Sequence, residues 1–512
     1  MMFRAKKTSL KVVALIVLFT MVSSTTLYGV ESTKDYVDWP IDVSSGDRTP
    51  ALLPRADQDS IQFHASTGFD IGVMGSNAWK SRKYQCTSPF DKRCVEERVL
   101  LLPSKRWKST NQLPICASPQ ESTLCIEKIL ISEQNGEKYL LTPSGTIPGY
   151  QWPANKTYGS PAGALTSTWS SGKDRQGSGY TLSAQVDVQG FYDKYETEIL
   201  QFRTTFFRYE LTPLKDPYLI ANQRTFCLWI DQSSSETKCA RQKFLDLNSL
   251  ITVTYHLPKE LTGWFAGRLK DATLTIKSID SDFNSVTVSA YPTEVPVFAA
   301  TIPCDKEKGP CGVGAMTGFT GIPKEEYIQS LQKILKDKAI LEIPSWGLRT
   351  TSTGQIRYER GCKVPSQGFA GLVFSNATFA YTFPPKFENE TLRYEMGALH
   401  LKSDGSVFKG NFDMFIESNF ARCLWRLSKE PVQASISVIS KDGVQNVATT
   451  SLGERDGFIR MKAAGFTFST STVEMKLQNV KPTKINCLRA SNKKVFTVSG
   501  NVCPKGSSKV AP

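Results

Sequence analysis

Histidine is scarce in this chain. The 512 residues include three, His64, His256 and His400, and each lies in an alternating pattern that predicts a β-strand. The sequence has no Cys-x-x-Cys, and three dispersed histidines provide no zinc-ligand spacing. His-Glu-x-x-His and Gly-x-Ser-x-Gly motifs are also absent. We therefore predict no metal site and no cofactor. Any of the three could act as a catalytic base, but we expect each to pack within its strand.

Complete phosphate-binding and calcium-binding loops are absent as well. Gly312 and Gly314 follow no strand pattern and lack a correctly spaced third glycine, so we predict a linker there. The run Asp280–Asn284 alternates oxygen ligands but lacks the central glycine and terminal glutamate of a calcium loop, which predicts a polar turn. No local motif identifies a catalytic residue. A glycosidase needs only two carboxylates and no local motif, so that class stays open.

Long apolar runs are absent after the N-terminus. The uncharged run Val12–Val22 follows four basic residues and precedes the small polar residues Ser23–Thr26. This arrangement is typical of a secretory signal peptide, which we assign to residues 1–30 and expect to be cleaved. An uncleaved anchor is the alternative, although Thr20 and the serines make a poor membrane span. We predict no transmembrane span after cleavage and a secreted or cell-surface location.

Cysteines are present in an even number and fall into close pairs along the chain. In an exported protein this indicates a disulfide framework, although connectivity does not follow from sequence. The neighbours are Cys86 and Cys94, Cys116 and Cys125, Cys227 and Cys239, Cys304 and Cys311, and Cys487 and Cys503, which leaves Cys362 and Cys423 as a long-range pair.

Most of the chain has the patterning of short strands. Turn signals lie between apolar runs at Asn135-Gly136, Asp404-Gly405 and Asp442-Gly443. One helix is predicted after Pro323, with Ile328, Leu331, Ile334 and Leu335 on one face. The fold class is therefore mostly β: two or three antiparallel β-sandwich-like domains, one linker helix and a small disulfide-closed C-terminal tail.

Seven segments follow from these patterns. They are a signal peptide (1–30), an extended lead-in (31–57), an N-terminal β domain (58–210), a first Cys-Leu-Trp β unit (211–300), a Gly/Pro linker and helix (301–339), a second β domain with a second Cys-Leu-Trp unit (340–478) and a basic disulfide tail (479–512).

The two Cys-Leu-Trp units suggest an internal repeat of strands. In the first, Trp229 precedes Trp264 of a Gly-Trp-Phe strand by 35 residues. In the second, Trp425 precedes Phe458 of a Gly-Phe-Ile strand by 33 residues. We expect both Trp229 and Trp425 to lie in the core.

Positive charge is concentrated at the C-terminus. Residues 479–512 contain seven basic residues and no acidic residue, which is half of the net charge of +14. Such a segment would attract a polyanion, for which we predict an anionic cell-wall polymer or an acidic glycan; a merely solvated terminus is the alternative. Nucleic acid is a poor partner for an exported chain. The candidate ligand-binding residues are Lys484, Arg489, Lys493, Lys494 and Lys505.

Several tryptophans lie in polar, loop-like surroundings. Trp107, Trp152 and Trp169 are candidates for stacking on sugars or on a partner, because a flat ring buries much area at small entropic cost. The alternative is that these rings cover the core beneath long loops.

Three segments together resemble the uncharacterised secreted, cell-envelope proteins of actinobacterial type. They are Cys116–Glu127, the Cys-Leu-Trp unit ending at Gly465–Ser469, and the tail from Ile485 to Gly506 with its two cysteines. The resemblance implies export and a surface role, and no activity. We therefore expect a non-enzymatic envelope-associated protein that binds wall polymer through its tail. The alternatives are a secreted carbohydrate-active enzyme, with the tryptophans in its cleft, and a surface scaffold or adhesin.

Overall fold

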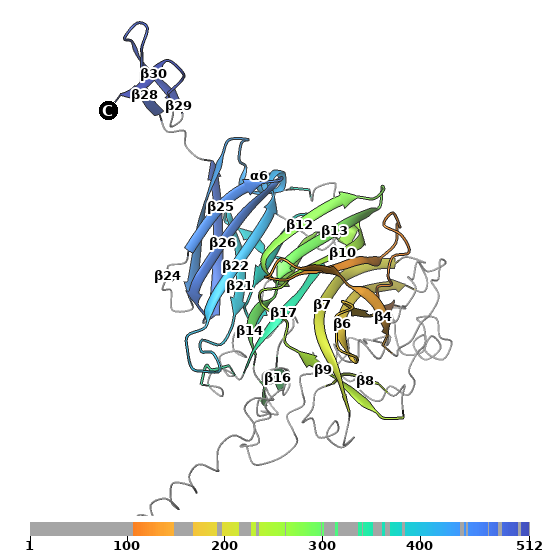
Figure 1. Ribbon diagram of the computed structural model, residues 1–512. Helices are drawn as coiled ribbons and strands as arrows, with labels where there is room; N and C mark the ends of the chain where they lie inside the picture. Colours follow the sequence, from red (N-terminus) through yellow and green to blue (C-terminus); the bar gives the residue numbers. More distant parts are fainter. Residues whose placement is uncertain are drawn as a thin grey trace, which may run out of the picture.

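The computed structural model of the protein is built mostly from β-strands (Figure 1). The predicted signal peptide and the predicted extended lead-in lie outside the residues that the structure describes. These residues are 106–147, 167–191, 197–213, 227–231, 235–261, 263–297, 299–301, 313–315, 336–339, 341–351, 361–363, 369–380, 384–440, 445–446, 449–468, 470–479, 484–499 and 503–510.

A 14-stranded sheet runs through the middle of the molecule and positions the other layers. Its main path has the order β25-β26-β22-β18-β11-β17-β7-β6-β5-β4. These strands are β25 (Thr449–Arg455), β26 (Phe458–Thr467), β22 (Lys409–Glu417), β18 (Gly371–Ser375), β11 (Trp264–Arg268), β17 (Leu341–Thr351), β7 (Thr197–Pro213), β6 (Ser178–Phe191), β5 (Ser167–Ser170) and β4 (Thr142–Thr146), joined at the sides by β1 (Arg106–Gln112), β8 (Cys227–Asp231), β9 (Lys238–Lys243) and β14 (Thr293–Val297).

Two smaller sheets pack against the large one. The five-stranded sheet contains β12 (Lys270–Ser278), β13 (Phe283–Tyr291), β10 (Leu250–Pro258), β2 (Cys125–Ser132) and β3 (Lys138–Leu140), in that order. The six-stranded sheet contains β19 (Phe379–Ala380), β20 (Lys386–Glu388), β21 (Thr391–Gly397), β27 (Thr470–Asn479), β23 (Val432–Ser440) and β24 (Gln445–Asn446). The short pair β15 (Ala299–Thr301) and β16 (Val313–Ala315) and the 3-10 turn η1 (Lys259–Leu261) complete this part.

Each smaller sheet encloses its own core against the large sheet. Phe206 and Trp346 of the large sheet meet Val253 and Val288 of the five-stranded sheet in the first core. The second core lies between the large sheet and the six-stranded sheet and is made of residues such as Met414, Ile459, Tyr394 and Val473. The arrangement is that of stacked β-sandwich layers, in which inner faces interdigitate.

Strands β11 and β18 belong to both cores. Trp264 lies in the second core while its neighbour Phe265 lies in the first, because successive side chains of a strand point to opposite faces. Every residue of both strands is buried, and the two strands pair in parallel. Strands buried on both faces have continuous apolar sequences rather than alternating ones. The sheet therefore runs without a break from the predicted first Cys-Leu-Trp unit into the second.

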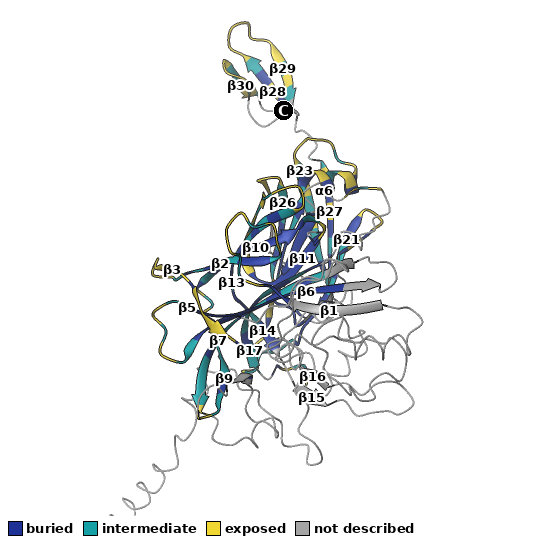
Figure 2. Ribbon diagram, turned by 90° about the vertical axis from the view of Figure 1, so that its right-hand side faces the viewer, coloured by how far each residue is buried: buried dark blue, intermediate teal, exposed yellow. Residues whose placement is uncertain are grey.

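The C-terminal residues form a separate small sheet. Strand β28 (Lys484–Arg489) lies between β29 (Val495–Ser499) and β30 (Ser507–Val510), and these strands pair only with each other. The Cys487–Cys503 disulfide closes this sheet. It lies apart from the other sheets in both views (Figures 1 and 2). The mostly-β prediction, with antiparallel sheets and a disulfide near the C-terminus, is confirmed.

The Cys-Leu-Trp tripeptide of the second unit is helical, so the expectation that both copies have the same strand structure there is wrong. Cys227-Leu-Trp229 lies in β8, whereas Cys423-Leu-Trp425 ends the helix α6 (Ser418–Trp425). The Glu417 side chain caps this helix by accepting a hydrogen bond from the Phe420 N–H, at 2.6 Å. Phe420, Leu424 and the expected core residue Trp425 are buried, which gives the helix its apolar face. The two tripeptides therefore have different local structures.

Several local predictions are confirmed. Gly136 and Gly405 have positive φ in the expected turns, whereas the Asp442-Gly443 turn lies outside the described residues. Disulfides join Cys116 to Cys125, Cys362 to Cys423 and Cys487 to Cys503, and Cys239 is also disulfide-bonded. The cysteines outside the described residues are Cys86, Cys94, Cys304 and Cys311.

The predicted linker helix lies almost entirely outside the described residues. Its last residues are described: Lys336 and Asp337 have positive φ, so they form a turn and no helix passes through them. Within the described ranges, no helix is long and apolar enough to cross a membrane.

A substitution at Gly371 tests whether both cores pack closely against β18. A Cβ atom there would lie 2.5 Å from the Trp264 ring and 2.6 Å from the Phe415 carbonyl oxygen. We expect Gly371→Ala to lower the free energy of unfolding by about 1–3 kcal/mol, which is the usual cost of overpacking a core. Urea denaturation measures this change. Gly453→Ala is the control, because a Cβ at Gly453 meets nothing within 4 Å. Equal stability of both variants would contradict the shared-strand packing.

Candidate functional site

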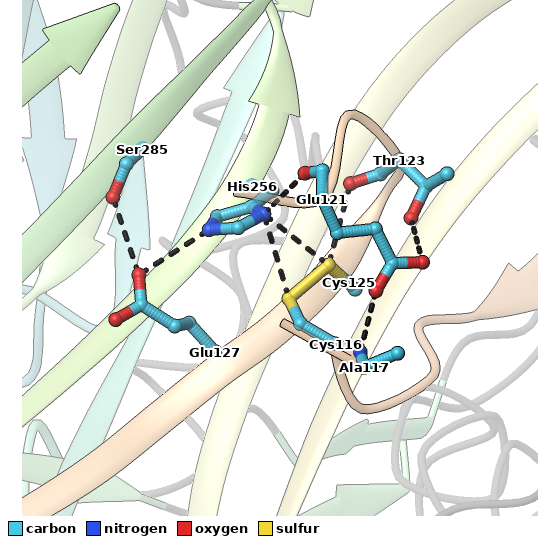
Figure 3. The surroundings of a disulfide bond; sticks show 8 residues. All are labelled: Cys116, Ala117, Glu121, Thr123, Cys125, Glu127, His256 and Ser285. Atoms are coloured by element: carbon cyan, nitrogen blue, oxygen red, sulfur yellow. Dashed lines mark hydrogen bonds and ion pairs between the residues drawn. A yellow bond between two sulfur atoms is a disulfide. The ribbon is translucent and has the colours of Figure 1, made fainter. Parts of the chain in front are cut away.

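In the described part of the chain, a network of polar contacts lies on the five-stranded sheet, around a disulfide and a buried histidine (Figure 3). The pairing register of the strands brings these residues together: His256 on β10 lies opposite Cys125 on β2 and opposite Ser285 on β13. Opposite residues of antiparallel strands share one face of a sheet. We call this arrangement the histidine–disulfide cluster. Its members are Cys116, Glu121, Cys125, Glu127, His256 and Ser285.

A β-bulge brings Glu127 into the cluster. The β2–β10 register shifts between Thr254 and Tyr255, so that Lys128 and Ile126 have partners while Glu127 lies between them without one. Bulges redirect side chains. The Glu127 carboxylate thus lies 3.2 Å from His256 Nε2, and the Ser285 hydroxyl donates to it at 3.4 Å.

His256 is completely buried, and both ring nitrogens contact hydrogen-bond acceptors. Nδ1 lies 2.7 Å from the backbone oxygen of Glu121. A carbonyl oxygen only accepts, so Nδ1 carries a proton there. The same nitrogen lies 3.6 Å from Cys116 Sγ and 3.5 Å from Cys125 Sγ (Figure 3). The imidazole therefore lies between a disulfide and a carboxylate.

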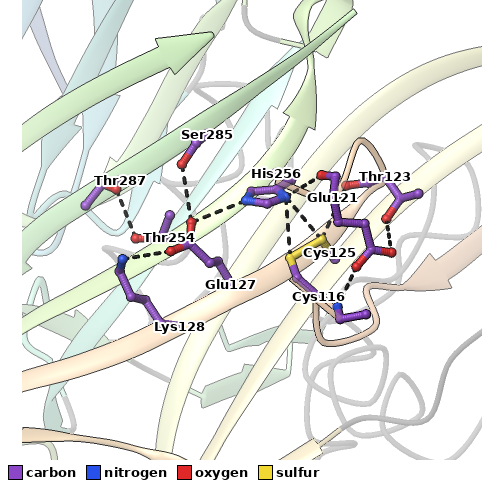
Figure 4. A network of polar contacts seen from close by, with 11 residues as sticks. Cys116, Glu121, Thr123, Cys125, Glu127, Lys128, Thr254, His256, Ser285 and Thr287 are labelled. Carbon is purple, nitrogen blue, oxygen red and sulfur yellow. Dashed lines mark hydrogen bonds and ion pairs between the residues drawn. A yellow bond between two sulfur atoms is a disulfide. The ribbon is translucent and has the colours of Figure 1, made fainter. Parts of the chain in front are cut away.

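The charge of Glu127 determines the proton on the other ring nitrogen. Burial raises the Glu127 pKa, but hydrogen bonds from Lys128, at 2.7 Å, and from His256 outweigh burial and leave that pKa below its ordinary value of 4.5 (Figure 4). The carboxylate is therefore ionised at neutral pH, and it accepts from Nε2. Both ring nitrogens of His256 thus face hydrogen-bond acceptors, the Glu121 carbonyl oxygen at Nδ1 and the Glu127 carboxylate at Nε2.

The loop between the two cysteines is held by Glu121. Its carboxylate accepts hydrogen bonds from the Thr123 hydroxyl at 2.7 Å and from the Ala117 N–H at 2.5 Å. These bonds, the Thr123 bond foremost, lower the Glu121 pKa. Since the backbone oxygen of Glu121 accepts from His256, the same residue fixes both the loop and the ring.

The cluster does not have the geometry of a nucleophile activated by a base. Ser285 contacts the Glu127 carboxylate, and no contact joins its hydroxyl to the imidazole. His256 is 0% exposed, so a substrate cannot reach it in this conformation. The arrangement instead places two sulfur atoms beside one imidazole ring of fixed orientation. The prediction that His256 lies in a strand is correct. Separations of 129 to 140 residues along the chain concealed Glu127 and the two cysteines as its neighbours.

Of the three tryptophans predicted to stack on a ligand, Trp169 is the one whose side chain the structure describes. Trp169 lies on β5 between β4 and β6 and is 2% exposed, so the prediction that it stacks on a ligand is wrong. Its ring belongs to the first core. Trp107 lies on β1 opposite Gly190, and Trp152 lies outside the described residues. Trp264 and Trp346, which the sequence did not single out as binding residues, are also buried core residues.

The predicted basic residues gather at one end of the C-terminal sheet. Hydrogen bonds join Arg489 to Lys494 and Ala490 to Gly506, which places the turn after β28 beside the turn before β30. We call this group the basic end; its members are Arg489, Lys493, Lys494 and Lys505, all exposed. The Arg489 guanidinium lies 5.1 Å from the centre of the Phe496 ring, a cation–π distance. Lys484 lies at the other end of β28.

Two acidic residues that the sequence did not identify lie where β22 and β26 meet the start of β12. Burial raises the pKa of Asp413, which Arg460 contacts through two nitrogens. Asp271 accepts from Lys462 at 2.5 Å. Each carboxylate is therefore matched by a cation. This pattern is that of ion pairs that join neighbouring strands.

Large apolar side chains are exposed only singly in the described part of the chain. Leu140, Val407, Leu452 and Val495 come from four different segments. An adhesive surface would require a contiguous patch of several hundred Å². These positions give the adhesin alternative no support.

The pH dependence of stability tests the ion pair in the cluster. Because the Glu127 pKa is lowered on folding, the folded chain binds fewer protons there than the unfolded chain. Its stabilising contribution is present above pH 4.5 and is lost as the pH falls through the folded pKa. We expect the free energy of unfolding to fall less steeply with decreasing pH in Glu127→Gln than in wild type, measured by denaturation between about pH 6 and pH 3.

The matched control for this measurement is Glu260→Gln, at an exposed glutamate of η1. It should keep the wild-type slope. If Glu127→Gln and wild type gave the same slope, the lowered pKa of Glu127 would be refuted.

Comparison with known proteins places this chain in no family: no family model, no curated protein and no solved structure matches it.

Proposed function

We propose that the protein is exported, has no enzymatic role, and associates with the cell envelope by binding an anionic polymer through its C-terminal sheet. The observation that carries the proposal is the basic end: four exposed cations on a self-contained sheet, in a segment of 34 residues without one acidic side chain. The disulfides and the missing membrane-spanning helix among the described residues are compatible with this location.

The positions of the cations favour a polymer over a small anion. Lys493 and Lys494 lie in one turn and Lys505 in another, so the charges are spread across one end of the sheet and do not converge on a pocket. Lys509 on β30 extends the charge along the sheet, opposite Cys487. A flexible chain of repeated phosphates or carboxylates can contact several such cations at once, and each contact adds to the attraction.

Arg489 provides the most defined contact. Its guanidinium is delocalised and planar and suits paired oxygen atoms of phosphate or carboxylate groups. The Phe496 ring beneath it holds the guanidinium in place. Since the exposed cations have no acidic neighbour in this segment, a bound polyanion would relieve their mutual repulsion. The binding is therefore expected to weaken as salt screens the charges.

Binding of fluorescently labelled inorganic polyphosphate tests the proposal. We expect the variant Arg489→Gln/Lys493→Gln/Lys494→Gln/Lys505→Gln to bind at least about tenfold more weakly than wild type at low ionic strength, by fluorescence anisotropy. About tenfold corresponds to about 1.4 kcal/mol, or a fraction of that for each exposed cation removed. Wild-type binding should also weaken strongly between low salt and roughly 0.3 M salt, where the Debye length falls below about 8 Å.

The control variant removes the same charge from other exposed lysines: Lys270→Gln/Lys277→Gln/Lys386→Gln/Lys429→Gln. It should bind within about twofold of wild type. Equal losses in the two variants would mean that only net charge matters and would refute the assignment to the basic end. Retention on isolated cell walls that carry phosphodiester polymers should follow the same order of variants.

A further inference from the structure

We propose that Cys116, Cys125 and His256 form a binding site for a thiophilic divalent metal ion, with Zn²⁺ as the expected ion, when the disulfide between the two cysteines is reduced. The three potential ligand atoms, two Sγ and Nδ1, all lie within 4.8 Å of one another. This inference is independent of the polymer-binding proposal, because it concerns a different sheet and different residues.

The distances suit tetrahedral coordination. With Zn–S of about 2.3 Å and Zn–N of about 2.0 Å, a tetrahedral angle separates sulfur from nitrogen by roughly 3.5 Å. His256 Nδ1 lies 3.6 Å from one Sγ and 3.5 Å from the other. The imidazole is therefore already at the ligand spacing from both sulfurs. The two sulfurs have to move apart, to roughly 3.8 Å by the same geometry.

The surroundings of His256 are those of a metal ligand. A ligating histidine commonly donates its second ring N–H to a carboxylate, which fixes the orientation of the ring. Glu127 provides this carboxylate, 3.2 Å from Nε2, and is itself held by Lys128 and Ser285 (Figure 4). The Glu121 carbonyl oxygen, 2.7 Å from Nδ1, now accepts the hydrogen bond that a metal would replace, so this carbonyl has to turn away when the metal binds. Complete burial of the ring keeps it from moving out of place.

Reduction can begin at Cys116, whose side chain is partly exposed, whereas Cys125 is completely buried. A dithiol reductant attacks the Cys116 sulfur, the Cys125 thiolate leaves, and the second thiol of the reductant then releases Cys116 as the reductant closes its own disulfide. Metal binding removes one proton from each cysteine thiol and the proton on Nδ1 of His256. The Nε2 proton stays on the ring and continues to be donated to Glu127.

The two states close the same loop. In the oxidised chain a covalent bond joins the ends of the segment from Cys116 to Cys125, and in the reduced chain the metal would join the same sulfurs and the β10 strand as well. The metal would thus hold this segment on the five-stranded sheet before the disulfide forms or after it is lost.

Titration of the reduced full-length chain with Co²⁺ tests the proposal. After reduction with a phosphine and its removal without oxygen, we expect one Co²⁺ per chain with the thiolate charge-transfer and ligand-field absorption of a tetrahedral site. Zn²⁺ should displace the Co²⁺. The oxidised chain should not give this absorption. Far-UV circular dichroism should show that the reduced chain keeps its strands.

Variants separate this site from the other cysteines. Cys116→Ser/Cys125→Ser should lose the signal although ten other cysteines remain. His256→Asn should lose the tetrahedral spectrum with all thiols present, whereas His400→Asn should keep it. Glu127→Gln should weaken the affinity by about 10- to 100-fold, as expected for a residue that orients a ligand. Equal Co²⁺ binding by wild type and by Cys116→Ser/Cys125→Ser would overturn the proposal.

A second design covers the case in which reduction unfolds the chain. Cys116→Asp/Cys125→His leaves the other disulfides intact and places ligands at the same positions without any reductant. We expect this variant to bind one Zn²⁺ in calorimetric titration and the same variant with His256→Asn added to bind none. Failure of the first variant to bind Zn²⁺ while it remains folded would also overturn the proposal.

Discussion

The structure depends on burying β11 and β18 on both of their faces at once. Trp264 and Phe265 are adjacent in sequence, yet they fill the cores on opposite sides of the large sheet. Apolar burial of this kind contributes roughly 25 cal/mol for each Å² removed from water, and here it is gained twice along the same short strands. Neither smaller sheet could dissociate without exposing one of these faces. Disruption of one core would therefore destabilise the other, although the two cores are built from distant parts of the chain.

Local features of the fold were readable from sequence, and the joining of its parts was not. Alternation and the Asn135-Gly136 and Asp404-Gly405 turns predicted strands and tight turns, which depend only on neighbouring residues. The parallel pairing of β11 with β18 joins residues about a hundred positions apart and leaves no local pattern. Helix α6 was missed because its cap is a glutamate, Glu417, and because its eight residues are too few for a clear period.

The candidate site shows the same division. The Thr-Tyr-His-Leu pattern placed His256 in a strand, and the nearness of Cys116 and Cys125 in sequence suggested their pairing without fixing it. The meeting of these residues, however, depends on the β2–β10 register and on a bulge at Glu127, both set by how two cores pack. Motif searches for metal ligands require short spacings, so a histidine 131 residues from its cysteine escapes them. The exposed cations of the tail were easier to predict, because charge density needs no tertiary contact.

The C-terminal sheet has its own pairing, its own small core of Ile485 and Cys487, and its own cross-link. Its strands do not complete any sheet of the body, so substitutions there leave the large cores unchanged. Such a unit can be exchanged between proteins: grafted onto another chain, it would carry its group of exposed cations with it. In evolution, its lysines could be replaced by residues suited to a new coating while the body stayed constant.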